Sequence, residues 1–291
     1  MNANKRTKSI AMEMLWPALR IIIGVYVGLC LFLFLFQSRY VYYPSRKTGS
    51  TPGSIGLKFD DLRIKTKDGE TITGWFVPAG NGGQETNVVR TVLVCHGNAG
   101  DIGGRVDNVK TFHDMGYNVL MFDYRGYGGS TGKPSEQGTY NDVLACWDYL
   151  KTEKNVSAQD VILYGQSLGG AVATWLAEQI KPGALILEST LTSVPAIAVK
   201  MFPYLPVRLL CTFKYDSLSR IENIHCPVLI AHSSDDEMIP FAHGQKLLKA
   251  ANEPKQFVEM KGDHNSCSID YDPSYRRIAG EFLEKYKKSN E

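Results

Sequence analysis

The residue that carries the clearest chemistry in this sequence is a serine in a glycine-flanked turn. Ser167 is the centre of Gly165-Gln166-Ser167-Leu168-Gly169, a G-x-S-x-G pentapeptide between the apolar run VILY and the helix-forming run AVATWLAEQI. The flanking glycines permit a strained turn that holds a hydroxyl clear of a sheet, beside the N–H groups of a helix start. We therefore predict that Ser167 is a nucleophile. The alternative is a glycine-rich turn that only packs a helix on the sheet.

A nucleophilic serine needs a general base, and His264 fits that role best. In proteins with this turn the chain order is serine, then acid, then histidine. His264 follows Ser167 and lies in a loop between the last predicted strand and the last predicted helix. The other downstream histidines lie at strand ends or inside a predicted helix: His225, His232 and His243. The alternative is a solvated loop histidine.

The acid that would orient the base stays open at this stage. Asp235 and Asp236 both follow the apolar run VLIA, and Glu188 ends the preceding predicted strand. One aspartate would orient the histidine, while the other would cap a helix that begins near Pro240.

Two backbone N–H groups are expected to bind the oxyanion that forms during acyl transfer. One belongs to Leu168, the residue after the nucleophile. The other belongs to Asn98, in the loop HGNAG that follows the apolar run VLVC. His96 opens this loop but precedes Ser167, so we expect it to stabilise the loop rather than act as the base.

The elements that position these residues form an alternating pattern. A hairpin is predicted from strands 58–65 and 71–77 around the turn Asp68-Gly69, followed by βα units. Further strands are predicted at 88–95, 118–122, 161–164, 184–187, 228–231 and 256–260, and helices at 104–115, 136–151, 168–180, 241–251 and 273–287. The continuous apolar runs indicate strands that are buried on both faces. We predict an α/β fold with a mostly parallel sheet of about eight strands.

The segment 189–226 is too long for a simple crossover between two strands and is a candidate for a small cap. Its part 194–213, VPAIAVKMFPYLPVRLLCTF, is the most apolar stretch after the N-terminus, and its three prolines argue against one long helix. It would either pack as a crossover or line an apolar acyl pocket tilted toward a bilayer.

The N-terminal segment predicts a retained single-pass membrane anchor at about 16–36. Residues 21–36 carry no charge, Arg20 precedes them, and Tyr40 and Tyr42 follow at an interfacial position. A signal peptide would need a small-x-small cleavage site, which Gln37-Ser38-Arg39 does not offer. Lipid attachment at Cys30 would need a small residue before it, and Leu29 is not small.

The division that follows is an N-terminal segment at 1–43, a Pro/Gly/Ser-rich linker at 44–57 and a catalytic domain at 58–291. Basic residues flank the anchor on both sides, at Lys5, Arg6, Lys8 and Arg20 before it and at Arg39, Arg46 and Lys47 after it. The positive-inside rule slightly favours a cytoplasmic N-terminus, with the hydrolase domain on the non-cytoplasmic side.

The composition narrows the function classes. The chain has 291 residues, 44% of them hydrophobic, and a net charge of +2, which is typical of a globular protein and gives no case for nucleic acid. The six cysteines are scattered, unlike a disulfide framework or a zinc site. GYGGSTGKP at 126–134 fails the phosphate-binding pattern G-x-x-x-x-G-K-[ST]. No cofactor and no metal are implied.

Taken together, these segments resemble the α/β-hydrolase superfamily. Within it they resemble the Bem46-like branch of membrane-tethered serine hydrolases, related to the ABHD13 and ABHD17 proteins. The resemblance covers roughly residues 58–288 and includes an N-terminal anchor. The matching segments are HGNAGD at 96–101, FDYRGYGGSTGKPSEQGTY at 122–140, GQSLGG at 165–170, LEST at 187–190, DDEMIP at 235–240 and GDHN at 262–265.

The resemblance implies a choice between the two aspartates. The family pattern H-G-x-x-D, laid on His232-Ser233-Ser234-Asp235-Asp236, assigns Asp236, although Ser233 stands where glycine is usual. It also implies a carboxylesterase- or thioesterase-like serine hydrolase that forms an acyl-enzyme on Ser167, with lipids or lipidated molecules among its candidate substrates. The alternatives are a peptidase or amidase of the same fold, and a catalytically idle, membrane-tethered binding module.

Overall fold

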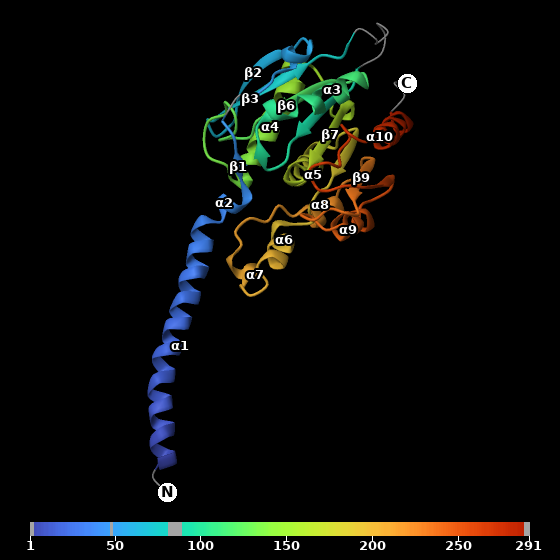
Figure 1. Ribbon diagram of the computed structural model, residues 1–291. Helices are drawn as coiled ribbons and strands as arrows, with labels where there is room; N and C mark the ends of the chain where they lie inside the picture. Colours follow the sequence, from blue (N-terminus) through green and yellow to red (C-terminus); the bar gives the residue numbers. More distant parts are fainter. Residues whose placement is uncertain (1–2, 47–48, 81–88, 288–291) are drawn as a thin grey trace.

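The computed structural model describes residues 3–46, 49–80 and 89–287, with side chains from Leu15 onward (Figure 1). Some predicted segments extend beyond these ranges. Residue 88 of the predicted strand 88–95, residues 47–48 of the predicted linker, and residues 81–88 and 288–291 of the predicted catalytic domain lie outside the described residues. The division into domains stays a prediction.

An eight-stranded sheet forms the centre of the molecule. Its strands are β2 (Asp60–Lys65), β3 (Thr71–Val77), β4 (Thr91–Cys95), β6 (Asn118–Phe122), β7 (Val161–Gln166), β8 (Ala184–Glu188), β9 (Val228–Ser233) and β10 (Lys255–Met260). They lie in the order β10-β9-β8-β7-β4-β6-β3-β2. All neighbours are parallel except β3, which is antiparallel to both β2 and β6. The predicted α/β-hydrolase fold is confirmed.

The burial of the strands follows from their sequences. Every residue of β4, β8 and β9 is buried, as expected for apolar runs covered on both faces. The edge strand β2 alternates between exposed and buried residues near its end, because only one of its faces meets the core.

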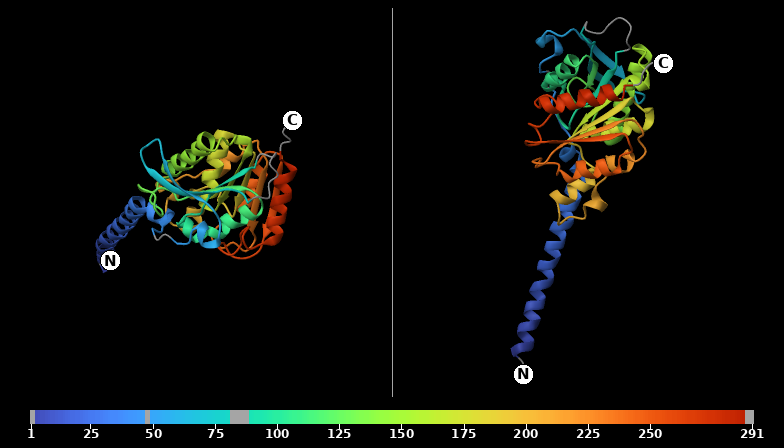
Figure 2. Two further views of the ribbon diagram at one scale, coloured as in Figure 1. Left: turned by 90° about the horizontal axis from the view of Figure 1, so that it is seen from above. Right: turned by 90° about the vertical axis from the view of Figure 1, so that its right-hand side faces the viewer.

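Helices cover both faces of the sheet (Figure 2). The five that flank it are α3 (Val106–Asp114), α4 (Glu136–Glu153), α5 (Leu168–Ile180), α9 (Ala242–Ala250) and α10 (Pro273–Lys285). Apolar residues of α4, α5 and α9 share one core, and those of α3 and α10 share the other. Side-chain caps begin two of these helices: Ser135 accepts from the N–H of Gly138, and Asp272 accepts from that of Ser274. Each of the five overlaps a predicted helix.

The segment 189–226 folds into three short helices, α6 (Val194–Met201), α7 (Val207–Leu210) and α8 (Ser217–Ile221). Pro203 and Pro206 lie between α6 and α7, so the predicted absence of one long helix is confirmed. Helices α6 and α7 stand off the sheet at the end of the domain from which the N-terminal helix leaves (Figures 1 and 2). Residues 194–213, which contain these two helices, are called the cap below.

The N-terminal helix α1 (Ala3–Phe36) projects away from the domain (Figure 1). Its part Leu15–Phe36 is 22 residues long with a mean hydropathy of 2.5 and no buried side chains. Length and composition of this kind are found in membrane spans and in signal sequences.

The chain between α1 and β2 packs on the domain at several points. After α2 (Ser38–Val41), the strand β1 (Tyr43–Pro44) pairs in parallel with β5 (Ala99–Gly100). A short 3₁₀ turn follows at Pro52–Ile55. The side chain of Tyr42 is buried between the domain and the cap, where its hydroxyl lies 2.8 Å from that of Tyr215.

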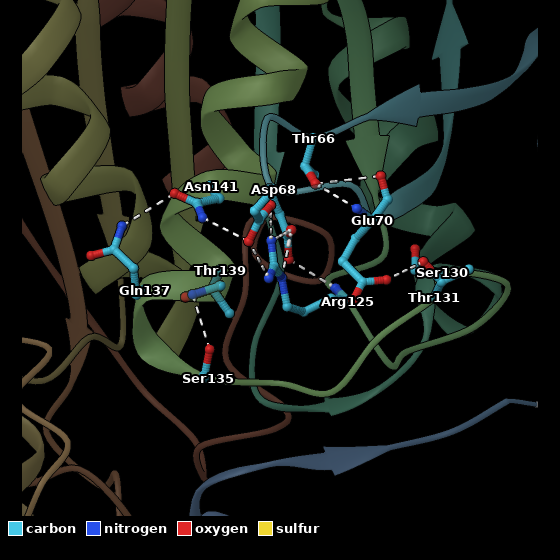
Figure 3. A network of polar contacts seen from close by, with 12 residues as sticks. Thr66, Asp68, Glu70, Arg125, Ser130, Thr131, Ser135, Gln137, Thr139 and Asn141 are labelled. Atoms are coloured by element: carbon cyan, nitrogen blue, oxygen red, sulfur yellow. Dashed lines mark hydrogen bonds and ion pairs between the residues drawn. The ribbon is translucent and has the colours of Figure 1, made fainter.

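A polar network ties the β2–β3 turn to the sheet and to α4 (Figure 3). The guanidinium of Arg125 donates to both carboxylate oxygens of Asp68 at 2.8 and 3.0 Å, and to Asp142 at 2.9 Å. Asn141 donates to Asp68 at 2.9 Å. Arg125 holds the pKa of Asp68 well below its ordinary value, whereas burial raises the pKa of Asp142 to about 6. Arg125 is thus the cation that makes a fully buried carboxylate tolerable.

This network predicts a large stability loss for Arg125→Met. The substitution leaves Asp142 buried without its cationic partner, a change that typically costs about 3–5 kcal/mol. Urea unfolding would measure it. The control is Arg277→Met, because Arg277 pairs with Glu281 at 2.7 Å on the exposed face of α10; such pairs contribute less than about 1 kcal/mol. Equal losses for the two variants would contradict this account of the network.

Candidate active site

The turn that carries Ser167 is strained and needs its glycines. Ser167 has φ 54° and ψ −121°, outside the regions that L-residues prefer. A Cβ at Gly169 would lie 2.1 Å from the carbonyl oxygen of Cys95, and one at Gly165 would lie 2.6 Å from that of Gly169. The turn is held by the Ser167 N–H, which donates to the Glu188 carbonyl at 2.9 Å. The predicted strand-turn-helix geometry is therefore present at β7 and α5.

Three of the predicted site residues lie in one hydrogen-bonded line. His264 Nε2 is 3.1 Å from Ser167 Oγ, and His264 Nδ1 is 2.7 Å from Asp236 Oδ2. All three residues are buried, at 9% exposure or less. They come from three separate loops at the carboxyl ends of β7, β9 and β10, which meet at one edge of a parallel sheet. The arrangement can move a proton from the serine to the histidine.

The two neighbouring aspartates have different surroundings. Asp236 Oδ1 accepts from the N–H groups of Met238 and Ile239 at 3.0 and 2.7 Å, which leaves Oδ2 for His264. Asp235 is exposed, and its Oδ2 accepts from the Gly262 N–H at 3.3 Å. The expected sharing of tasks does not occur, because Asp236 both binds the histidine and closes the following turn. Asp235 instead braces the loop that carries His264.

Asn98 and Leu168 lie beside Ser167, where an oxyanion would form. Leu168 is the first residue of α5, so its N–H has no partner within the helix. The Asn98 carbonyl accepts from the N–H of Tyr43 at 3.0 Å and from the hydroxyl of Tyr127 at 2.7 Å. Its side chain donates to the Val41 carbonyl at 2.9 Å. The position of Asn98 is thus set partly by the segment that follows α1.

The other buried histidines have lowered pKa values, and their hydrogen-bond partners are groups other than Ser167. His96 lies behind the loop that it opens, with Nδ1 2.6 Å from the Gly97 carbonyl, and burial lowers its pKa to about 3. Burial also lowers the pKa of His243 to about 4, and Thr192 is its hydrogen-bond partner. His232 lies under Asp236, with Nε2 2.8 Å from the Ile239 carbonyl, and its pKa is lowered by burial. The loop-stabilising position expected for His96 agrees with these contacts.

Glu188, weighed from the sequence as a possible acid, has another position. It is fully buried at the end of β8, where it accepts from the N–H of Ile269 at 3.0 Å and from the side chain of Gln166 at 3.1 Å. Burial raises its pKa to about 8. Since Ile269 belongs to the loop that carries His264, Glu188 joins that loop to the residue before the serine.

Arg105 is a positioning residue that the sequence interpretation missed. It donates to the Gln166 side chain at 3.0 Å and to the Ala99 carbonyl at 2.8 Å, and so connects the serine turn to the Asn98 loop. Nothing in the local sequence around Arg105 identifies these partners.

An apolar cavity of about 450 Å³ opens above the serine. Ser167, Leu168, Asn98 and His264 form its polar end. The rest is lined mainly by apolar residues of the cap and of the chain around the end of α1. A cavity of this size and character suits an apolar group joined to a reacting carbonyl.

Several known proteins resemble this chain over most of its length. A family model described as serine aminopeptidase, S33, matches residues 86–217. The chain is 31% identical over 291 aligned residues to the alpha/beta hydrolase domain-containing protein WAV2 of Arabidopsis thaliana, with 90% of this chain and 92% of that protein covered. The chain belongs to the α/β-hydrolase family.

Other relatives of this α/β hydrolase include an uncharacterized protein of Mycobacterium tuberculosis. It is 38% identical over 254 residues, which cover 87% of this chain and 89% of that protein. Among solved structures, the Pyrococcus furiosus esterase Pf2001 superposes with a TM-score of 0.68 at 21% identity, covering 85% of this chain and 98% of that one. At that identity the likeness shows the fold.

The buried Glu188 makes the stability of this hydrolase depend on pH. Its pKa rises from 4.5 to about 8 on folding, so the folded state holds a proton that the unfolded state releases. That stabilisation is complete below about pH 4.5 and is lost as the pH rises toward about 8. Glu188→Gln resembles the neutral acid and should unfold with a weaker pH dependence, measured in urea between about pH 5 and about pH 9.

The control for this experiment is Glu259→Gln, because Glu259 lies exposed on β10. It should unfold with the pH dependence of the wild type. A Glu188→Gln variant with an unchanged pH dependence would show that Glu188 is already ionised in the folded protein.

Proposed function

We propose that this protein is a membrane-anchored serine hydrolase that cleaves ester or thioester bonds of acyl groups, with Ser167, His264 and Asp236 as its catalytic triad. The observation that supports the proposal is the unbroken hydrogen-bonded line from Asp236 through His264 to Ser167 at the polar end of an apolar cavity. Each member has the partner that its role requires.

The first half of the reaction forms an acyl-enzyme. Ser167 Oγ attacks the acyl carbonyl carbon while its proton passes to His264 Nε2. Asp236 accepts the hydrogen bond from Nδ1–H, fixes that tautomer and stabilises the imidazolium. The carbonyl oxygen becomes an oxyanion that the N–H groups of Leu168 and Asn98 bind. The intermediate then expels the alcohol or thiol, which takes the proton from His264.

The second half uses water in place of the serine. Water loses a proton to His264 Nε2 as its oxygen attacks the acyl carbon. Collapse of the second tetrahedral intermediate breaks the bond to Ser167 Oγ, which recovers the proton from His264. The balance is one ester or thioester and one water consumed, and one carboxylic acid and one alcohol or thiol released.

The cavity favours an acyl ester or thioester over a peptide. An aminopeptidase has to bind the charged amino group of its substrate, for which buried acidic or polar partners are needed. Glu237 is the acidic residue among those that line this cavity, and it accepts the N–H of His264 at 3.1 Å. The remaining lining is mostly apolar and suits a hydrocarbon chain.

The membrane part of the proposal rests on Leu15–Phe36, which would act as a retained single-pass anchor. The basic residues before and after it favour a cytoplasmic N-terminus and a hydrolase domain on the other side. Together with the motifs around the site, this arrangement supports a place in the Bem46-like branch.

A fluorophosphonate probe tests the nucleophile. The wild type should be labelled, because the probe phosphonylates a serine that a histidine activates. Ser167→Ala should abolish the labelling, and Ser189→Ala, which alters a neighbouring buried serine outside the triad, should keep it. Absence of labelling in the wild type, while a control hydrolase reacts, would favour the idle binding module.

Asparagine substitutions test the choice of acid. Asp236→Asn should lower kcat on the order of 10⁴-fold, because the amide favours the wrong histidine tautomer. Asp235→Asn should lower it less than about tenfold, since the Asp235 carboxylate accepts from the Gly262 N–H and the Ser234 hydroxyl and not from the His264 ring. The assay is steady-state hydrolysis of a short-chain ester. A greater loss for Asp235→Asn would reverse the assignment.

A further inference from the structure

The end of α1 forms one wall of the cavity above Ser167. Leu33 and Phe34 of α1 line it, as do Gln37 and Tyr40 immediately after the helix. Other lining residues, such as Ile197, belong to α6 and α7 of the cap. Leu33 and Phe34 also belong to the apolar stretch Leu15–Phe36. The substrate cavity and the candidate membrane span therefore share residues.

Hydrogen bonds join α1, and the residue that follows it, to the cap. Gln37 Nε2 donates to the Leu210 carbonyl at 3.3 Å, and Gln37 Oε1 accepts from the N–H of Thr212 at 2.8 Å. Nearer the N-terminus, within α1, the hydroxyl of Tyr26 donates to the Tyr204 carbonyl at 3.0 Å. These three backbone groups of the cap thus have partners, as they would need in a water-free layer.

The contact at Tyr26 indicates how far the cap would reach into a membrane. Tyr26 lies ten residues before Phe36, which is about 15 Å along a helix at 1.5 Å per residue. The whole stretch Leu15–Phe36 is about 33 Å long by the same measure, close to the thickness of a hydrocarbon layer. If this stretch spans the bilayer, the tip of the cap lies inside the leaflet nearest the domain.

The surface of the cap has the composition that such a position requires. Tyr204 and Leu209 are 89% and 85% exposed, and Met201 is 64% exposed. Residues 194–213 contain no acidic residue, and their two charges are the exposed basic side chains of Lys200 and Arg208. Long basic side chains can extend to the phosphates of a lipid surface while their stems stay in apolar surroundings.

We propose that the α6–α7 cap is inserted in the bilayer beside α1, and that the two together form a binding site for the long acyl chain of a bilayer-resident ester or thioester. This inference rests on the proposed hydrolase function. The acyl chain would pass from the leaflet into the cavity between α1 and the cap, with its carbonyl at Ser167. It would not have to cross water on the way. Helix α1 is then a part of the substrate site as well as an anchor.

The chain-length preference tests the wall formed by α1. The full-length protein in lipid vesicles would be assayed with 4-methylumbelliferyl palmitate and butyrate, which share a leaving group. Leu33→Trp narrows the cavity and should lower the palmitate-to-butyrate ratio of kcat/KM about tenfold or more. The matched control is Leu35→Trp, because Leu35 is exposed and does not line the cavity. It should keep the ratio of the wild type.

The outcomes of this assay separate the two proposals. A ratio that Leu33→Trp leaves unchanged, or a wild type that cleaves butyrate but not palmitate, would overturn the acyl-chain site while leaving the hydrolase intact. Failure of the wild type to cleave either ester would count against the hydrolase function itself.

Lipid crosslinking tests the insertion of the cap without any catalysis. A benzophenone amino acid at position 209 should form adducts with vesicle lipids on illumination. The same group at position 35 of α1 is the positive control, and position 281 on the exposed face of α10 is the negative one. Adducts at 35 without adducts at 209 would refute the inserted cap, whatever the activity.

Discussion

The strained backbone of Ser167 is the constraint on which the rest of the site depends. At φ 54° and ψ −121° the turn is unfavourable for a serine, so its surroundings have to hold it in place. They do so with glycines that let the Cys95 carbonyl and α5 approach closely, and with the hydroxyl of Thr190, which donates to the Ser167 carbonyl at 2.6 Å. The central strands are buried on both faces and supply the rigidity that this turn requires.

The serine turn is also joined to the neighbouring loops by side-chain hydrogen bonds. Glu188 and Gln166 join the His264 loop to the serine turn, and Arg105 joins that turn to the Asn98 loop. Asn98 is in turn fixed by Tyr43 and Val41, from the segment that follows α1. A displacement of the N-terminal segment would therefore move Asn98, whose N–H is proposed to bind the oxyanion.

Much of the fold and the order of the site residues could be predicted from the sequence, because both depend on local patterns. Apolar runs of four or five residues located the buried strands, and a serine between glycines located the turn. The choice between Asp235 and Asp236 could not be made locally, since both follow the same strand. It depends on which carboxylate meets a histidine 28 residues later in the chain. The roles of Glu188 and Arg105 also depend on distant partners. So does the contact of Gln37 with the cap, which joins residues 173 positions apart.

The central claim is that acyl groups are transferred to Ser167. It is tested most directly by mass spectrometry of the full-length protein, quenched with acid during turnover of an acyl ester. The account predicts a mass gain equal to one acyl group, located on the peptide that contains Ser167 and absent from Ser167→Ala. Turnover with no covalent adduct, or an adduct on another side chain such as a cysteine, would contradict it.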